Sequence, residues 1–210
     1  MPEILSVDLQ YDAKAPNHRD TKSNKTQISN GRAVRKMMNI LELYVYSSHV
    51  RRKFVGKLSE LPWSEVTKNR EASFYSMRNI LLHMIDNEDW MVNWVIYNKC
   101  REYQREKKSD DYQNMQEVLD HLNRVEEKTR EYFKNTAGKS GEFERRVNFV
   151  TSAGKEFDLS VEECLFQSFT EQLYHLGELI ALLWQDNIEP PTMQWFWNNP
   201  RTAKTTDLSG

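Results

Sequence analysis

Four long segments of this 210-residue chain carry apolar side chains every three or four residues, and this pattern constrains the fold more than any other feature. The segments cover about residues 32–57, 73–103, 112–134 and 161–185. Such spacing places the apolar side chains on one face of an α-helix. Glycine (7) and proline (6), which interrupt helices, are scarce. The sequence therefore predicts an all-α protein, an up-down four-helix bundle.

The connections between these segments also carry signals. The stretches RRVNFV and EFDLS flank TSAGK, so a small β-hairpin is predicted between helices three and four. Ser160 and Glu163 form a capping box that starts the fourth helix at about residue 161. The SDD stretch at residues 109–111 offers N-cap residues for the third helix. LPWSEVTKNREA is predicted to be the connector between the first two helices.

Composition divides the chain into three parts. Residues 1–30 are polar and form an N-terminal arm, residues 31–190 form the helical bundle, and residues 191–210 form an aromatic segment and tail. The aromatic stretch TMQWFWNNP is expected to fold back on the bundle, and the alternative is a surface for a partner protein.

Charge, hydropathy and cysteine content bound the function. The chain has 29 basic and 31 acidic residues, a balance unlike that of a nucleic-acid-binding protein. There is no apolar run near the ~20 residues that cross a bilayer, and MPEILSVDLQYDAKAP is unlike a secretory signal. The two cysteines, Cys100 and Cys164, lack CxxC spacing, and Arg101 beside Cys100 would point elsewhere on a helix, which argues against a zinc site or a catalytic thiol. We therefore expect a cytoplasmic protein with free thiols, bound neither to a membrane nor to nucleic acid.

Five histidines are available for chemistry. His18 lies in the polar arm, and the charged neighbours of His49 and His121 predict that both are solvated. Only His83 and His175 are embedded in apolar helical sequence. These two are therefore the candidates for a functional site.

His83 lies on a largely aromatic helical stripe. At about 100° per residue it shares a face with Asn87, Trp90 and Trp94. One interpretation is a core histidine with a hydrogen-bonded ring nitrogen. The other is a metal ligand at the wall of an aromatic cleft.

Glu171 and His175 are one helical turn apart, so their side chains can converge on one point. On a helical wheel the main apolar stripe lies on nearly the opposite side, which also allows an exposed surface pair. Cys164 and Leu182 bracket the Glu171–His175 pair with uncharged groups, which favours a half-open cleft.

Two imidazoles and one carboxylate make a suitable site for a divalent metal. Neutral histidine and ionised glutamate bind zinc, nickel, iron or manganese. Three protein ligands leave open positions on the ion, and Lewis-acid or metal-thiolate chemistry requires such positions.

The stretches SMRNILLHMIDNEDWMVNW and ECLFQSFTEQLYHLGELIALLWQDNIEPP resemble the DinB/YfiT-like superfamily of four-helix metalloproteins. The resemblance covers about residues 35–195. It implies a metal triad of His83, Glu171 and His175. In the family pattern HxxxHRGQ, this chain has Glu171 at the first histidine, Leu176 at the arginine and Glu178 at the glutamine.

A His, Glu, His triad resembles the mycothiol-dependent maleylpyruvate isomerase branch of that superfamily. The resemblance implies a small-molecule substrate, a low-molecular-weight thiol that the metal activates, and a homodimer. Activities in the superfamily include thiol S-transfer and isomerisation.

Two functional hypotheses follow. In the first, the chain is a metal-dependent thiol transferase, isomerase or hydrolase. Its substrate pocket contains Asn87, Trp90 and Trp94, and Tyr174 or Glu178 acts as the acid-base group or outer partner. In the second, it is a non-catalytic helical module with a decayed metal site that binds a small ligand or a partner.

Overall fold

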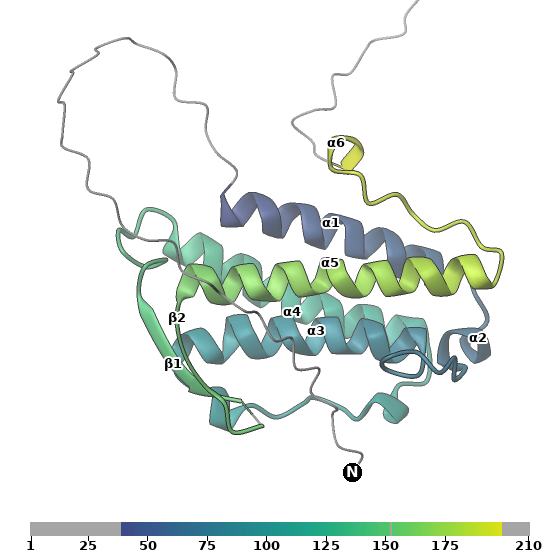
Figure 1. Cartoon of the computed structure of the whole chain (residues 1–210), viewed down its shortest axis with the longest axis horizontal. Coiled ribbons are helices and arrows are strands. Elements are labelled where there is room, and N and C mark those ends of the chain that lie inside the picture. The colour runs from purple at the N-terminus through teal and green to yellow at the C-terminus, as the bar shows by residue number, and fades with distance from the viewer. Residues whose placement is uncertain (1–38, 152, 199–210) are drawn as a thin grey trace, which may run out of the picture. The chain divides into compact units, whose positions relative to one another are not determined.

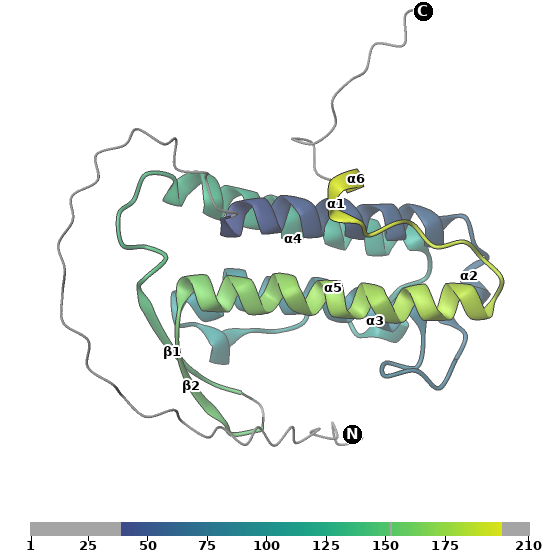
Figure 2. The same ribbon diagram turned by 45° about the horizontal axis from the view of Figure 1, so that its top comes forward.

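A computed structural model describes residues 39–151 and 153–198 of the chain. The α5 helix packs against α1 and α3, and α4 packs against the same two helices. Figure 2 shows the two resulting layers, α1 with α4 and α3 with α5. The predicted four-helix bundle with a hairpin between its last two helices is thereby confirmed. The long helices are α1 (Ile40–Ser59), α3 (Met77–Asn93), α4 (Met115–Thr136) and α5 (Val161–Gln185) (Figure 1).

Contacts between the helices give their directions. Ser73, just before α3, binds Glu178, whereas Glu88, further along α3, binds the earlier residue Gln172, so α3 and α5 are antiparallel. The start of α3 lies near the start of α4, where Arg78 pairs with Asp110, so these two helices are parallel. Along the chain the helices therefore run up, down, down and up, so the predicted bundle does not alternate strictly in the up-down order. The long connection between α3 and α4 allows this order because it returns along the bundle (Figure 1).

Each long helix begins at a polar side chain that accepts a backbone N–H. The predicted capping box of Ser160 and Glu163 is confirmed. The predicted cap at residues 109–111 is wrong, because Ser109–Asp111 forms a separate 3₁₀ turn before α4. The caps are Asn39 for α1, Ser76 for α3, Asn114 for α4 and Ser160 for α5.

The second helix was expected to reach about residue 103, and this boundary is wrong. The α3 helix ends at Asn93, and the chain continues through 3₁₀ turns at Val95–Tyr97 and Cys100–Glu102. Asn98 has a positive φ of 60°, a conformation that Asn tolerates and that ends a helix. The apolar pattern continued past the helix because residues 95 and 96 are buried in the 3₁₀ turn.

The predicted hairpin consists of β1 (Arg146–Val150) and β2 (Glu156–Ser160), which pair antiparallel. Phe149 pairs with Phe157 in the register, and it also contacts Trp90 of α3 edge to face at 5.6 Å between ring centroids. The hairpin therefore packs against the C-terminal half of α3.

His121 is buried, so the expectation of a solvated side chain is wrong. It is only 2% exposed because the connection between α3 and α4 covers it, and its Nδ1 lies 2.6 Å from the hydroxyl of Tyr112. Burial lowers the pKa of His121. Asp86 lies beside it, and burial raises the pKa of this carboxyl to about 7 although Arg105 pairs with it.

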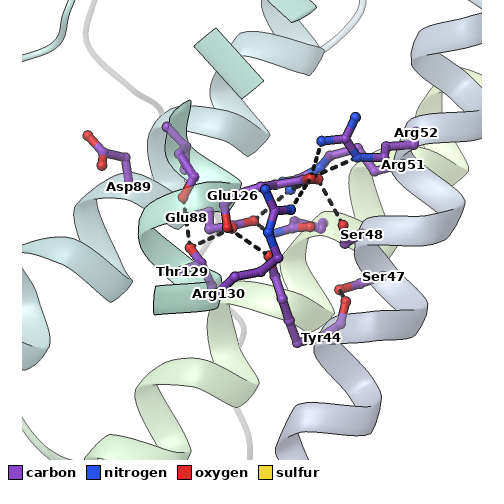
Figure 3. Close-up of polar contacts among 12 residues, drawn as sticks. Tyr44, Ser47, Ser48, Arg51, Arg52, Glu88, Asp89, Glu126, Thr129 and Arg130 are labelled. Carbon is purple, nitrogen blue, oxygen red and sulfur yellow. Dashed lines mark hydrogen bonds and ion pairs between the residues drawn. The ribbon is translucent and has the colours of Figure 1, made fainter. Parts of the chain in front are cut away.

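The bundle contains a fully buried charge cluster (Figure 3). Nη2 of Arg51 on α1 lies 2.8 Å from a carboxylate oxygen of Glu88 on α3 and 2.8 Å from one of Glu126 on α4. Gln172 on α5 donates to Glu88, so all four long helices contribute. Burial disfavours the charge of Arg51, but the two carboxylates outweigh this effect and raise its pKa.

Two short helices lie in the connections. The connector after α1 contains α2 (Trp63–Thr67), and the C-terminal segment contains α6 (Trp195–Asn198). Trp195 packs on Tyr46 of α1 at 4.7 Å, so the segment folds back as predicted, although Phe196 and Trp197 remain exposed.

The predicted arm at residues 1–30 with His18, the expected start of the first helix at residues 32–38, and the tail at residues 199–210 lie outside the described residues. Among the helices of the described part, none is both long and apolar enough to cross a membrane.

Candidate metal centre

His83 on α3 and the pair Glu171 and His175 on α5 meet where the two antiparallel helices pack together. Each residue offers one ligand atom, and these three atoms lie within 4.8 Å of one another. Nε2 of His83 is 3.0 Å from Oε1 of Glu171, and Nε2 of His175 is 3.8 Å from the same oxygen. The structure thus brings together the three residues that the sequence singled out as ligands.

The triad lies at the border of the core. The side chains of His83 and Glu171 are each 24% exposed, whereas that of His175 is 7% exposed. The expectation that this stripe lies opposite the apolar face of α5 is wrong, because Cys164 and Leu182 on the same stripe are buried. The buried face of α5 is wide enough to include both stripes, since α5 packs on α1 and α3. The site is therefore anchored in the bundle and open on one side.

Glu171 is held in its ionised form. Burial would raise its pKa, but interactions with the imidazoles of His175 and His83 outweigh burial and lower the pKa well below its usual range. Nδ2 of Asn87 donates to Oε2 of Glu171 at 3.1 Å, and Gln167 donates to the same oxygen at 3.3 Å. An ionised carboxylate with one oxygen turned to both imidazoles is ready to bind a cation.

A second carboxylate orients His175. Its Nδ1 lies 2.8 Å from Oε2 of Glu178, and Ser73 donates its hydroxyl to that same oxygen at 2.9 Å. Burial would lower the pKa of His175, but its interactions with the carboxylates of Glu171 and Glu178 raise it. When Nδ1–H donates to Glu178, the lone pair of Nε2 points toward the space shared with Glu171 and His83. Metal-binding histidines in proteins are commonly fixed in this way.

Aromatic rings surround the two imidazoles. Phe74 stacks on His83 with ring centroids 4.1 Å apart, and it meets His175 edge to face at 5.3 Å. Tyr174 meets His175 at 5.0 Å and is 67% exposed. The two imidazoles therefore have apolar neighbours, and one phenol lies at the solvent side.

The predicted substrate residues occupy different places. Asn87 is at the site through its bond to Glu171. Trp90 lies one turn further along α3 against Phe149 of the hairpin. Trp94 is the C-cap residue of α3, its backbone is no longer helical, and its ring packs on Tyr103. Their roles in binding a substrate stay predictions.

Sequence reasoning missed two residues of the site, Ser73 and Phe74. Both lie in the loop before α3, which begins at Met77 and not at about residue 73 as predicted, so helical periodicity does not indicate which of their side chains turns inward. The two aromatic residues in the Ser-Phe-Tyr stretch before the Ser76 cap indicate that this segment packs on the protein. They do not indicate that Phe74 packs on His83.

The donor set fits a divalent metal. Two ligand atoms that lie 2.0–2.2 Å from one tetrahedral ion are separated by about 3.4 Å. The measured separations of 3.0 Å and 3.8 Å from Glu171 to the two histidines fall on either side of that value. His83, Glu171 and His175 would hold the ion, and their number leaves coordination positions open.

The fold and the site together define a class, a helical bundle with a two-histidine, one-glutamate candidate metal site on facing helices. A sequence model described as the DinB family matches residues 34–205. This chain belongs to the DinB family, as the resemblance in the sequence indicated.

A solved structure supports the same fold. A DinB-like protein from Bacillus cereus ATCC 10987 is similar with a TM-score of 0.57 at 13% sequence identity, over 73% of this chain and 94% of that chain. The comparison with curated proteins gave no match.

Proposed function

We propose that this chain is a divalent-metal-dependent enzyme that acts on a small molecule, of the thiol S-transferase, isomerase or hydrolase type. The observation that carries the proposal is the convergence of His83, Glu171 and His175 within 4.8 Å on two separate helices. Membership of the DinB family agrees with it. A simple surface pair of Glu171 and His175 would need no third ligand from a second helix. It would also need no carboxylate such as Glu178 on the other ring nitrogen of His175.

A bound metal would act as a Lewis acid that lowers the pKa of a thiol or a water. The residues of the chain prepare the site for it. Asn87 donates to one oxygen of Glu171 and leaves the other for the ion. Glu178 accepts a hydrogen bond from the Nδ1–H of His175 and so acts mainly as its outer partner. Tyr174 is the exposed group beside His175, and we assign to it the exchange of a proton with the substrate.

The donor set suits zinc, nickel, iron or manganese. We propose a low-molecular-weight thiol as co-substrate, because a glutamate between two histidine ligands resembles the mycothiol-dependent isomerase branch. Asn87, Trp90 and Trp94 are the proposed substrate contacts. Of these three residues Asn87 has the most direct support, because it donates a hydrogen bond to Glu171.

One observation favours the alternative, a non-catalytic module. His83 and Glu171 are 3.0 Å apart, so the pair satisfies itself as a hydrogen bond without an ion. The two hypotheses differ in their response to chelators. A self-satisfied cluster would leave the protein equally stable with and without a chelator, whereas a metal site would not.

The test is elemental analysis of protein purified without a histidine tag. We expect close to one divalent metal per chain in the wild type and loss of the metal in His175→Ala. His49→Ala is the matched control, because His49 is an exposed histidine on α1 away from the triad. Metal-free wild-type protein that gains no stability from added Zn²⁺, Ni²⁺, Fe²⁺ or Mn²⁺ would contradict the proposal.

We also propose that the chain forms a homodimer, as the family resemblance implies, and that it resides in the cytoplasm. Cys100 and Cys164 are free thiols in the structure, which agrees with a reducing compartment. Light scattering on the purified full chain tests the dimer, and a monomeric mass at micromolar concentration would contradict it.

A further inference from the structure

The loop between α2 and α3, Lys68–Ser76, reaches both histidines of the candidate metal centre. Phe74 stacks on the ring of His83 at 4.1 Å and meets His175 edge to face at 5.3 Å. Ser73 donates to Glu178, the carboxylate that contacts His175. The loop therefore contacts the site twice, although it supplies none of the three ligands.

The two histidines are oriented by different means. The Nδ1 of His175 has a carboxylate partner in Glu178 at 2.8 Å. For His83 the hydrogen bond runs from Nε2 to Glu171, and within residues 39–151 and 153–198 no partner is found for its Nδ1. One hydrogen bond fixes one end of the His83 ring, so the tilt of the ring about that bond depends on its packing. The ring planes of Phe74 and His83 are inclined by only 20°, so Phe74 supplies that packing.

Contacts of Arg70, near the start of the loop, tie the loop to two helices. Arg70 is 7% exposed and binds Asp186 at the end of α5 at 2.6 Å and Glu65 of α2 at 3.2 Å. Glu71 and Tyr75 have positive φ values of 55° and 67°, a left-handed conformation that is unfavourable for residues other than glycine. Such strain persists only where the surrounding structure fixes the chain, and it is concentrated at functional sites. Here it places Phe74 over the imidazoles.

We propose that Phe74 and Ser73 are positioning residues that direct both imidazoles toward one ion. Phe74 acts on His83 by stacking, and Ser73 acts on His175 through Glu178. This inference rests on the proposed function, since it assigns these residues to the same site. It implies that metal affinity depends on a loop that never touches the metal.

The test measures Co²⁺ binding by the full chain, with a chromophoric chelator as competitor, together with the visible absorption of bound Co²⁺. Outer partners of metal ligands commonly change affinity by 10–100-fold. We expect Phe74→Ala to weaken binding by about tenfold or more and to change the Co²⁺ spectrum. Phe74→Tyr keeps the flat ring and should restore both the affinity and the spectrum. Tyr75→Ala is the control, because it removes the neighbouring aromatic ring, which is 55% exposed.

Ser73 is tested in the same assay. Ser73→Ala should weaken Co²⁺ binding by up to about tenfold, whereas Ser73→Thr keeps the hydroxyl and should restore binding. If Phe74→Ala does not fold, Phe74→Leu replaces it, because leucine fills space without a flat ring and should also weaken binding.

The outcomes separate this inference from the proposed function. Wild-type protein that binds Co²⁺, with folded Phe74→Ala or Phe74→Leu of equal affinity and spectrum, would overturn the inference and leave the metal site standing. Wild-type protein that binds no Co²⁺ would overturn both.

Discussion

Glu171 and Gln172 are neighbours on α5, yet they face opposite environments. Glu171 belongs to the metal centre and accepts a hydrogen bond from Asn87, whereas Gln172 is buried and donates to Glu88. Their partners on α3, Asn87 and Glu88, are also neighbours. Each helix therefore carries one amide beside one carboxylate, and each amide donates to the carboxylate of the other helix. A shift of one residue between α3 and α5 would break both pairs. At the residue scale, the same contacts that fix the helix register also place the ligands.

Replacing Glu178 tests the support of His175. Glu178→Ala removes the acceptor of the His175 Nδ1 proton, so the ring loses its orientation and metal affinity should fall by about 10–100-fold. Glu162→Ala, an exposed glutamate at the start of the same helix, is the control. Competition titration with a chelator measures both variants. Unchanged affinity in Glu178→Ala would show that Glu178 does not orient the ligand.

Among the elements, the helices are joined by the buried cluster around Arg51, which binds Glu88 of α3 and Glu126 of α4 (Figure 3). Buried ion pairs contribute little net stability when complete, but loss of one member leaves a buried charge without compensation. Arg51 has no exposed side-chain surface, so its removal leaves two carboxylates in the core. The cluster therefore favours one arrangement of the helices over others.

We expect Arg51→Met to lower the free energy of unfolding by about 3–5 kcal/mol. Arg52→Met is the matched control, because Arg52 binds the same Glu126 but is 40% exposed. Its effect should stay below about 1 kcal/mol. Urea denaturation measures both variants. Equal losses in the two variants would contradict the role given to the buried pair.

Sequence reasoning was accurate for elements with a local signal. The bundle, the hairpin and the start of α5 follow from periodicity, turn residues and the Ser160–Glu163 box. It failed at the end of α3, where buried residues continue the apolar pattern in a 3₁₀ turn. The α5 helix ends at Gln185, and Asn187 follows its C-cap residue. Its φ of 58° shows that Asn occupies the left-handed position that glycine favours.

In the candidate site, too, residues with a local sequence signal were predictable and residues placed by tertiary packing were not. His83, Glu171 and His175 were found because two of them share a helix turn and the family pattern supplies the third. Phe74 was not found, because a loop carries no periodicity and its contact with His83 depends on tertiary packing. Likewise, charged neighbours in the sequence did not reveal that His121 is buried beneath a long connection.

For the whole molecule, stability should depend on pH through Asp86. Burial raises the pKa of this carboxyl in the folded chain to about 7 from a usual 3.8. Between these values the folded chain binds more protons than the unfolded chain, so the contribution of Asp86 to stability falls as pH rises. The limiting slope for one proton is about 1.4 kcal/mol per pH unit.

Asp86→Asn isolates this effect. We expect its stability relative to wild type to increase by about 1–3 kcal/mol between pH 5 and pH 8. Urea denaturation of both proteins over this range measures the difference, and Asp110→Asn, in the connection between α3 and α4, is the control. A difference that stays constant with pH would show that Asp86 does not titrate in this range.

Metal binding should also stabilise the whole chain, because its ligands come from two helices that separate on unfolding. An ion at 100 times its dissociation constant adds about 2.7 kcal/mol to the free energy of unfolding. A rise in the melting temperature with Zn²⁺, reversed by chelator and absent in Glu171→Gln, is the expected result. Equal shifts in wild type and Glu171→Gln would place the metal elsewhere.

X-ray absorption spectroscopy of the protein loaded with one equivalent of Zn²⁺ tests the metal centre most directly. We expect nitrogen and oxygen ligands at about 2.0–2.2 Å, with the multiple scattering of two imidazole rings. His83→Ala and His175→Ala should each remove one ring from the spectrum. A spectrum without imidazole scattering, or one that both variants leave unchanged, would contradict the assignment of His83, Glu171 and His175 as the metal ligands.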